Sequence, residues 1–106
     1  MGRKLPPVDA ELYKRCDEVL HFLWDPVGVS GHPSSRDEYY GYIPAIFELV
    51  KNDAAAEDIV HALNNLESDQ MGLRPNKDNA CNVANILLEW RAWIYESFAQ
   101  GIVEER

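Results

Sequence analysis

Apolar residues recur at helical spacing in four segments of the chain, and no segment shows the strict alternation that is typical of a half-buried strand. The first segment covers about residues 10–24 and follows Asp9, which we expect to be its N-cap. It ends at Asp25, because the residue before a proline is disfavoured in the α conformation. One apolar stripe runs along this segment, consisting of Leu12, Cys16, Val19, Leu20 and Leu23.

The opposite face of this first segment carries Asp17, His21 and Asp25, which follow one another at intervals of four residues. Residues four apart in a helix lie on the same face. Such a column is able to hold a metal or relay a proton. Its position opposite the apolar stripe, however, predicts that it faces solvent.

The second segment begins with Ser35 and Glu38, a spacing typical of a helix capping box, and its apolar stripe reaches Val50. Pro44 lies inside this pattern. A proline there either kinks the helix or marks the place where a first turn ends and a new helix begins, because it lacks a backbone N–H and clashes with the preceding turn. We expect a helix kinked at Pro44.

The third segment covers about residues 54–70, with Asn52 or Asp53 as its N-cap and Gly72 after its end. The fourth segment, about residues 77–100, is the most apolar and has two ridges. A helix that is apolar over more than half of its circumference is either central in a fold or part of an interface. The first ridge is Ala80, Ala84, Leu87, Ile94 and Phe98, and the second is Val83, Ile86, Trp90 and Trp93.

Four amphipathic segments joined by short connections predict an all-α fold, namely a compact single domain that resembles a four-helix bundle. We expect this domain to include the whole of residues 1–106, with residues 1–8 as a flexible arm ahead of the first helix.

The charge of the chain limits the partners that it attracts. Its formal net charge is −8 at pH 7, whereas a protein that binds nucleic acid needs a surface rich in lysine and arginine. We therefore expect no nucleic-acid binding. If the charge serves recognition, it favours a basic protein partner. The same acidity is equally consistent with solubility alone.

No apolar run reaches the roughly 18 residues that span a bilayer, and the N-terminal residues lack the apolar region of a secretory signal. Cys16 and Cys81 lie in separate helical segments, which favours reduced thiols over a disulfide framework. These features predict a cytoplasmic protein that does not contact a membrane.

Candidate chemistry is concentrated between the first two helical segments, where Asp25, His32, Asp37 and Glu38 lie close together in sequence. Carboxylates and an imidazole that converge on one point are able to bind a metal or to serve as general acid and base. Each of these residues also has an ordinary place in a helix end or a loop. No nucleophile arrangement or phosphate-binding loop accompanies them. The preferred interpretation assigns no catalytic residue, metal or cofactor.

The same four residues, together with Tyr40, form a candidate interaction surface. Helical phase predicts that Tyr39 and Tyr42 point inward and that Tyr40 points away from the core. Tyrosine rings are common at protein interfaces because they supply a large contact area at a low entropy cost.

The fourth segment contains a charged residue on its apolar side. Arg91 lies within its apolar arc, where a guanidinium must extend to water or meet a carboxylate. We expect a structural ion pair between Arg91 and an acid of residues 25–38.

Trp90 and Trp93 belong to the second ridge, and surplus apolar surface of this kind is typical of an interface. We therefore expect a homodimer formed through Trp90 and Trp93.

The runs FLWDPVGV, RDEYYGYIPAIFELV and AAAEDIVHALNNLESDQMGL resemble a family of small, acidic, uncharacterised bacterial proteins. In that family an Asp-Pro-hydrophobic-Gly-Val loop precedes an Asp-Glu-Tyr helix, and a later helix ends in Met-Gly-Leu. The resemblance covers roughly residues 12–73. It implies a small α-helical domain without an assigned activity, so no catalytic residue is carried over.

Small acidic proteins of this general type include immunity partners of toxins, although this is an analogy and not a motif match. We therefore expect a non-enzymatic protein-interaction module, immunity-like or regulatory, that binds a basic protein. The alternative is a small metal-dependent hydrolase that uses Asp25, His32, Asp37 and Glu38.

Overall fold

The structure is a computed structural model that describes residues 5–99. Its α-helices are α1 (Pro7–Val19), α2 (Ile43–Lys51), α3 (Ala56–Asn65) and α4 (Lys77–Ala99). Two π-helical turns continue α1 and α3, namely η1 (Leu20–Trp24) and η4 (Leu66–Gln70), and two 3₁₀ turns precede α2, namely η2 (Pro33–Ser35) and η3 (Tyr40–Tyr42). No residue from 5 to 99 lies in a strand, and the prediction of an all-α fold with four helices is confirmed.

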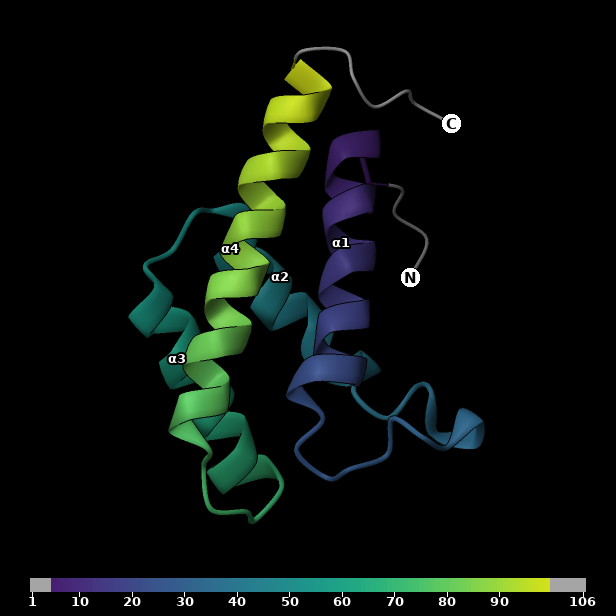
Figure 1. Cartoon of the computed structure of the whole chain (residues 1–106), viewed down its shortest axis with the longest axis vertical. Helices are drawn as coiled ribbons and strands as arrows, with labels where there is room; N and C mark the ends of the chain where they lie inside the picture. The colour runs from purple at the N-terminus through teal and green to yellow at the C-terminus, as the bar shows by residue number, and fades with distance from the viewer. Residues whose placement is uncertain (1–4, 100–106) are drawn as a thin grey trace.

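The longest helix, α4, packs against each of the other three α-helices. It lies beside α1 and runs in the opposite direction, while α3 flanks its other side and α2 lies behind (Figure 1). Near the end of α4 the Tyr95 hydroxyl donates a hydrogen bond of 2.7 Å to Asp9 Oδ1 in the first turn of α1. Burial and this hydrogen bond raise the pKa of Tyr95 to about 12, so its hydroxyl remains a donor.

The start of α1 differs from the expected one. The helix begins at Pro7, where a proline is tolerated because the N–H it lacks would have no partner in the first turn. Asp9 is therefore inside the first turn instead of capping it. Leu5 and Val8 pack against the core, so residues 5–8 belong to the fold. The rest of the expected arm, residues 1–4, lies outside the described residues.

The chain bends just before Pro44. Residues 36–39 form a turn that leads into η3, and α2 then begins at Ile43 with Pro44 in its first turn. The interruption expected at this proline is confirmed, and it takes the form of a first turn that ends before a new helix. Ser35 and Glu38 do not open an α-helix, which corrects the capping-box prediction.

The connection between α2 and α3 also differs from its prediction. Asn52 and Asp53 follow the end of α2 and do not cap α3, which begins at Ala56. Asp53 has a φ of 58°, a left-handed conformation that Asp tolerates at a sharp change of direction. Gly72, with a φ of 66°, follows η4 as expected.

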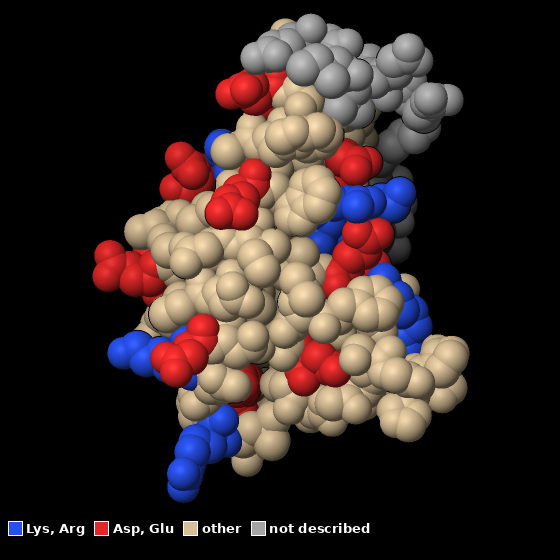
Figure 2. Space-filling view, viewed as in Figure 1, with Lys and Arg blue, Asp and Glu red and all other residues tan. Residues whose placement is uncertain are grey.

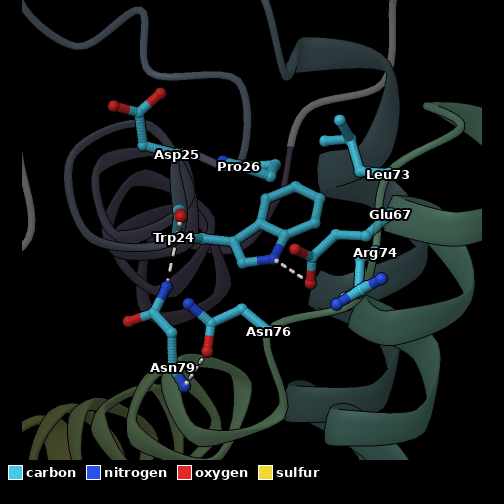
Figure 3. A pocket seen from close by; sticks show the side chains of 8 residues that line it. All are labelled: Trp24, Asp25, Pro26, Glu67, Leu73, Arg74, Asn76 and Asn79. Atoms are coloured by element: carbon cyan, nitrogen blue, oxygen red, sulfur yellow. Dashed lines mark hydrogen bonds between the residues drawn. The ribbon is translucent and has the colours of Figure 1, made fainter.

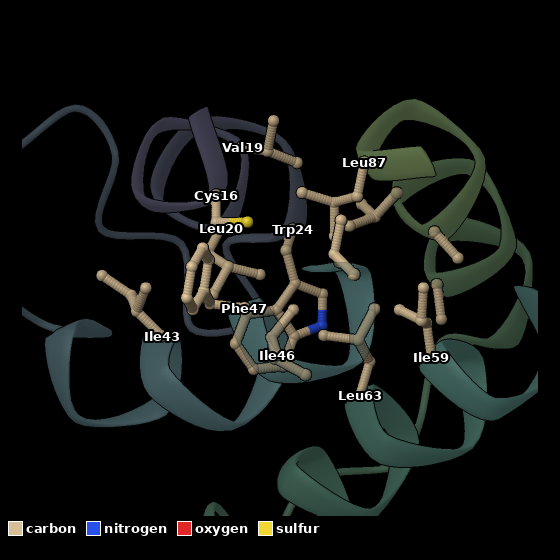
Figure 4. Close-up of a cluster of buried hydrophobic side chains, with 14 of the residues drawn as sticks. Cys16, Val19, Leu20, Trp24, Ile43, Ile46, Phe47, Ile59, Leu63 and Leu87 are labelled. Atoms are coloured by element: carbon tan, nitrogen blue, oxygen red, sulfur yellow. The ribbon is translucent and has the colours of Figure 1, made fainter. Parts of the chain in front are cut away.

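One apolar core joins all four α-helices (Figure 4). Burial of a Leu, Ile or Val side chain contributes about 1.5–3 kcal/mol each. Cys16 is fully buried, as its place on the apolar stripe predicts, and burial raises the pKa of its thiol to about 12. Val83 belongs to this core and not to a surplus ridge, which corrects its assignment. The fully buried side chains include Leu12, Cys16, Leu20, Ile46, Val50, Ile59, Leu63, Val83, Leu87 and Ile94.

The π-helical turn η1 changes which residues of the first helix face inward. Its backbone bonds span five residues, as shown by the Asp25 N–H, which donates to the Leu20 carbonyl at 3.0 Å. Residues after Leu20 are therefore rotated relative to an α-helix. His21 is only 2% exposed and Leu23 is 47% exposed, the reverse of the sequence prediction. The column of Asp17, His21 and Asp25 is therefore not a solvated face.

Two alanine substitutions within η1 test this rotation. Leu20 is fully buried, so Leu20→Ala is expected to lower the free energy of unfolding by about 2–5 kcal/mol through lost contacts and a cavity. Leu23→Ala is expected to change it by no more than about 0.5 kcal/mol. Denaturant midpoints of the two variants measure the difference. Equal losses would contradict the rotation and restore the α-helical phase.

Candidate functional site

Asp25 organises the segment between α1 and α2 from a left-handed backbone conformation with a φ of 34°. Its Oδ1 accepts a hydrogen bond of 2.7 Å from the Tyr39 hydroxyl and one of 2.8 Å from the Val29 N–H. Its Oδ2 accepts a third bond of 3.1 Å from the Ser30 N–H. The carboxylate thus satisfies the backbone of the loop and joins it to a buried ring.

These contacts determine the charge state of the pair. Burial alone would raise the pKa of Asp25, but the hydrogen bonds from Tyr39 and from the loop together lower it below its ordinary value. Burial raises the pKa of Tyr39, and its hydrogen bond to Asp25 raises it further. Asp25 is therefore an ionised acceptor and Tyr39 a neutral donor.

The predicted metal-binding residues are not gathered together. His32, Asp37 and Glu38 are exposed, whereas Asp25 is engaged by its loop. Within residues 5–99 no three or more His, Cys, Asp or Glu side chains are grouped so that they could hold a metal ion. The geometry that the hydrolase alternative needs is absent from these four residues.

The segment between α1 and α2 is held by an ion pair, although not by the expected one. Arg36 Nη1 and Nη2 donate to the two carboxylate oxygens of Asp17 at 2.9 and 3.0 Å. The Arg36 guanidinium also lies 5.5 Å from the ring centre of Phe22 and 6.0 Å from that of Tyr40. Arg36 therefore joins α1, η1 and η3 at the surface.

Arg91 contacts the connection between α2 and α3 instead of the acids of residues 25–38, which corrects its expected pairing. Its Nε donates to the Lys51 carbonyl at 3.1 Å, and its guanidinium lies 4.6 Å from the Tyr95 ring centre. Asp53 is 3.9 Å from Nη1 and is exposed. Such a long, solvated ion pair contributes little to stability.

Most of the exposed large apolar side chains of residues 5–99 lie around the segment between α1 and α2. They are Phe22, Leu23, Val27 and Tyr40, and only Trp93 lies elsewhere. Tyr39 is buried and Tyr40 is half exposed, as helical phase predicted. We call Phe22, Leu23, Val27 and Tyr40, with the exposed acids Asp37 and Glu38, the 22–40 surface.

A second apolar feature lies on α4. Trp90 and Trp93 meet edge to face with ring centres 6.0 Å apart. Together with Ile86 and Glu89 they line a groove of about 420 Å³. The Arg15 guanidinium covers part of Trp90, whereas the Trp93 side chain is 54% exposed. The unpartnered part of the second ridge is therefore centred on Trp93.

Sequence reasoning missed a polar cleft of about 390 Å³ at the end of the bundle where η1, η4 and the start of α4 meet (Figure 3). The Trp24 indole faces Glu67 there, and its Nε1 donates to Glu67 Oε1 at 3.4 Å. Asn79 Nδ2 donates to the carbonyl oxygens of Leu23 and Trp24, each at 3.2 Å. The lining residues are Trp24, Asp25, Pro26, Glu67, Leu73, Arg74, Asn76 and Asn79.

One signal in the sequence points to this cleft. Glu67 follows Leu63 by four residues and Val60 by seven, so it continues the apolar stripe of α3. An acid in that position is the same kind of anomaly as Arg91 in α4. In the structure Glu67 is only 4% exposed.

The surface in Figure 2 has acidic side chains scattered around an uncharged area over α4, with basic side chains toward the lower left and the right. None of the helices within residues 5–99 combines the length and the apolar character of a membrane span. The chain matches no protein-family model, no curated protein and no solved structure. Its resemblance to the family of small acidic bacterial proteins therefore stays a prediction.

Asp25→Asn tests the role of Asp25. The amide replaces a charged acceptor with a neutral group whose NH₂ cannot accept, so the free energy of unfolding is expected to fall by about 1–3 kcal/mol at neutral pH. Because the folded state lowers the pKa of Asp25 below 3.8, its stabilisation is present above that pH and is lost as the pH falls further.

Urea titrations of wild type and Asp25→Asn at neutral pH and at about pH 3 measure this dependence. The difference in the free energy of unfolding between wild type and Asp25→Asn is expected to be smaller at about pH 3 than at neutral pH. Asp37→Asn, at an exposed position, is the matched control and should stay close to wild type at both pH values. If the difference between wild type and Asp25→Asn did not change with pH, the stabilising role of the ionised Asp25 carboxylate would be contradicted.

Proposed function

We propose that this protein is a non-enzymatic interaction module that binds a basic protein partner through the 22–40 surface. The observation that carries the proposal is the concentration of exposed Phe22, Leu23, Val27 and Tyr40 in one part of the described chain. Aromatic and aliphatic side chains that share an exposed area are characteristic of protein interfaces.

Charge supports the choice of a basic partner. The chain has a net charge of −8, and the exposed acids Asp37 and Glu38 shortly precede Tyr40 of the 22–40 surface in the sequence. Rim charges of one sign accelerate the association with a partner of the opposite sign and exclude partners of the same sign. An immunity-like or regulatory role, in which the module covers a functional surface of a basic protein, is consistent with this arrangement.

The Arg36 contacts support a preformed surface. Arg36 lies between Phe22 and Tyr40 and is bound by both oxygens of Asp17, so two exposed rings are held in place without a partner. Holding side chains in place before binding lowers the entropy cost of association.

Affinity capture from a lysate of the native host tests the proposal. Wild-type protein is expected to retain a basic protein, and the double variant Phe22→Ser/Tyr40→Ser is expected to lose it. Trp93→Ser is the matched control, because Trp93 is about as exposed as Phe22 but lies on α4. It should capture the same partner as wild type.

The same capture repeated at rising salt concentration separates charge from apolar contact. Screening weakens the attraction between exposed charges, so the amount of partner captured should fall with salt for wild type and for Trp93→Ser alike. A partner that is acidic, or one retained equally by Phe22→Ser/Tyr40→Ser, would refute the proposal.

Self-association through α4 is a separate prediction. With Val83 in the core, the surplus ridge is Ile86, Trp90 and Trp93, and we expect it to pair with the same ridge of a second chain. Sedimentation at micromolar concentration should show a dimer that Trp93→Glu converts to a folded monomer. A wild-type protein that is already monomeric under these conditions would exclude the dimer.

A further inference from the structure

The Glu67 carboxylate at the Trp24 cleft has few partners for a residue that is so deeply buried. Its side chain is 4% exposed, and its one hydrogen-bond donor among residues 5–99 is Trp24 Nε1 at the long distance of 3.4 Å. None of the ion pairs in this part of the chain includes Glu67. A carboxylate removed from water is costly unless a cation or several donors face it. The Glu67 carboxylate is therefore able to bind a cation that enters the cleft.

The walls of the cleft present acceptors. Both bonds from Asn79 Nδ2 go to backbone carbonyl oxygens, which leaves Asn79 Oδ1 as an acceptor. Asn76 Oδ1 accepts from the Asn79 N–H at 3.1 Å, as the cap of α4. Asp25 also borders this space, but its carboxylate points away from Glu67 and is bound by its own loop (Figure 3). A ligand group that fits this cleft is positively charged and rich in donors.

The Glu67 carboxylate distinguishes between the guanidinium of arginine and the ammonium of lysine. A guanidinium is planar, binds a carboxylate through two parallel N–H groups and stacks on aromatic rings, whereas an ammonium is a compact and strongly hydrated charge. The Trp24 indole lies beside Glu67 in the wall of the cleft (Figure 3) and is only 3% exposed, so its ring face is not available for stacking. The choice of a guanidinium therefore rests on Glu67, whose two carboxylate oxygens suit the paired N–H groups of a guanidinium better than a single ammonium.

We propose that this cleft binds the guanidinium of an arginine side chain in the basic partner. The proposal rests on the proposed function and adds a specific recognition site to it. Pro26, which lines the cleft, is adjacent to Val27 of the 22–40 surface, so one partner is able to contact both. Arg74 also lines the cleft, is exposed and forms no ion pair within the described residues, and its like charge opposes the incoming arginine.

Titration with N-acetyl-arginine methylamide, followed in ¹H–¹⁵N spectra, tests the site without the partner. The chain has three tryptophans, so Trp90 and Trp93 supply internal reference signals on α4. The Trp24 indole N–H signal is expected to move and to saturate with the arginine probe. The citrulline analogue, which has the same shape without the charge, should leave it in place, and the lysine analogue should bind more weakly.

Two variants assign the effect to the cleft. Glu67→Gln retains an acceptor for Trp24 Nε1 but removes the charge, so it should weaken the binding of the arginine probe by at least about tenfold. Arg74→Ala removes the like charge and should bind the probe at least as tightly as wild type. An unchanged affinity in Glu67→Gln, or a weaker one in Arg74→Ala, would overturn the proposal.

The wild-type titration is decisive by itself if Glu67→Gln fails to fold. Equal responses to the arginine and citrulline probes would overturn the proposal. So would a Trp24 signal that does not saturate, or saturation confined to Trp90 and Trp93.

Failure of the site and failure of the proposed function give different results. If wild type captures no basic partner but its Trp24 signal responds to the arginine probe, the proposed function fails and the cleft retains its specificity. If capture succeeds and Glu67→Gln captures the partner as well as wild type does, the cleft proposal alone fails.

Discussion

The packing of Trp24 at the end of η1 is the interaction on which this end of the molecule depends. The indole is almost fully buried, with ring centres 5.4 Å from Tyr39 and 6.3 Å from Tyr42. Its Nε1 reaches Glu67 in η4, and its carbonyl oxygen accepts from Asn79 in α4. One residue thus joins the end of the first helix to the segment before α2 through its ring, to η4 through its indole N–H and to α4 through its backbone carbonyl. The π-helical turn η1 ends at Trp24, and η4 contributes Glu67.

Two acids next to this indole have opposite environments. Asp25 has three short hydrogen-bond donors and serves to organise its own loop. Glu67 is more deeply buried and has one long hydrogen bond. A carboxylate whose oxygens already accept hydrogen bonds from its own chain has few acceptor positions left for a ligand. A carboxylate with one long hydrogen bond still has several. This contrast explains why the candidate binding site is the cleft that contains Glu67 and not the acid-rich loop.

Helical periodicity predicted the four helices and the buried Cys16, because both depend only on the repeat of an α-helix. Tyr39 is buried and Tyr40 exposed as predicted, although they lie in the turns before α2 and not in an α-helix. Helical periodicity failed for His21 and Leu23, since the wider turn of η1 breaks that repeat. It failed also for the partner of Arg91. Ion pairing is decided by which segments lie side by side, and the middle of α4 lies next to Lys51 and Asp53.

The order of amino acids alone determines that this chain is helical, acidic and apolar on one side of each helix, because propensity, charge and periodicity are properties of neighbours in sequence. The Trp24 cleft depends on contacts that no local pattern contains. Trp24 and Glu67 are separated by 43 positions and Trp24 and Asn79 by 55, and they meet only when η1, η4 and α4 converge. Trp24 and Glu67 each lie in a π-helical turn, where the α-helical repeat on which a local pattern depends is interrupted.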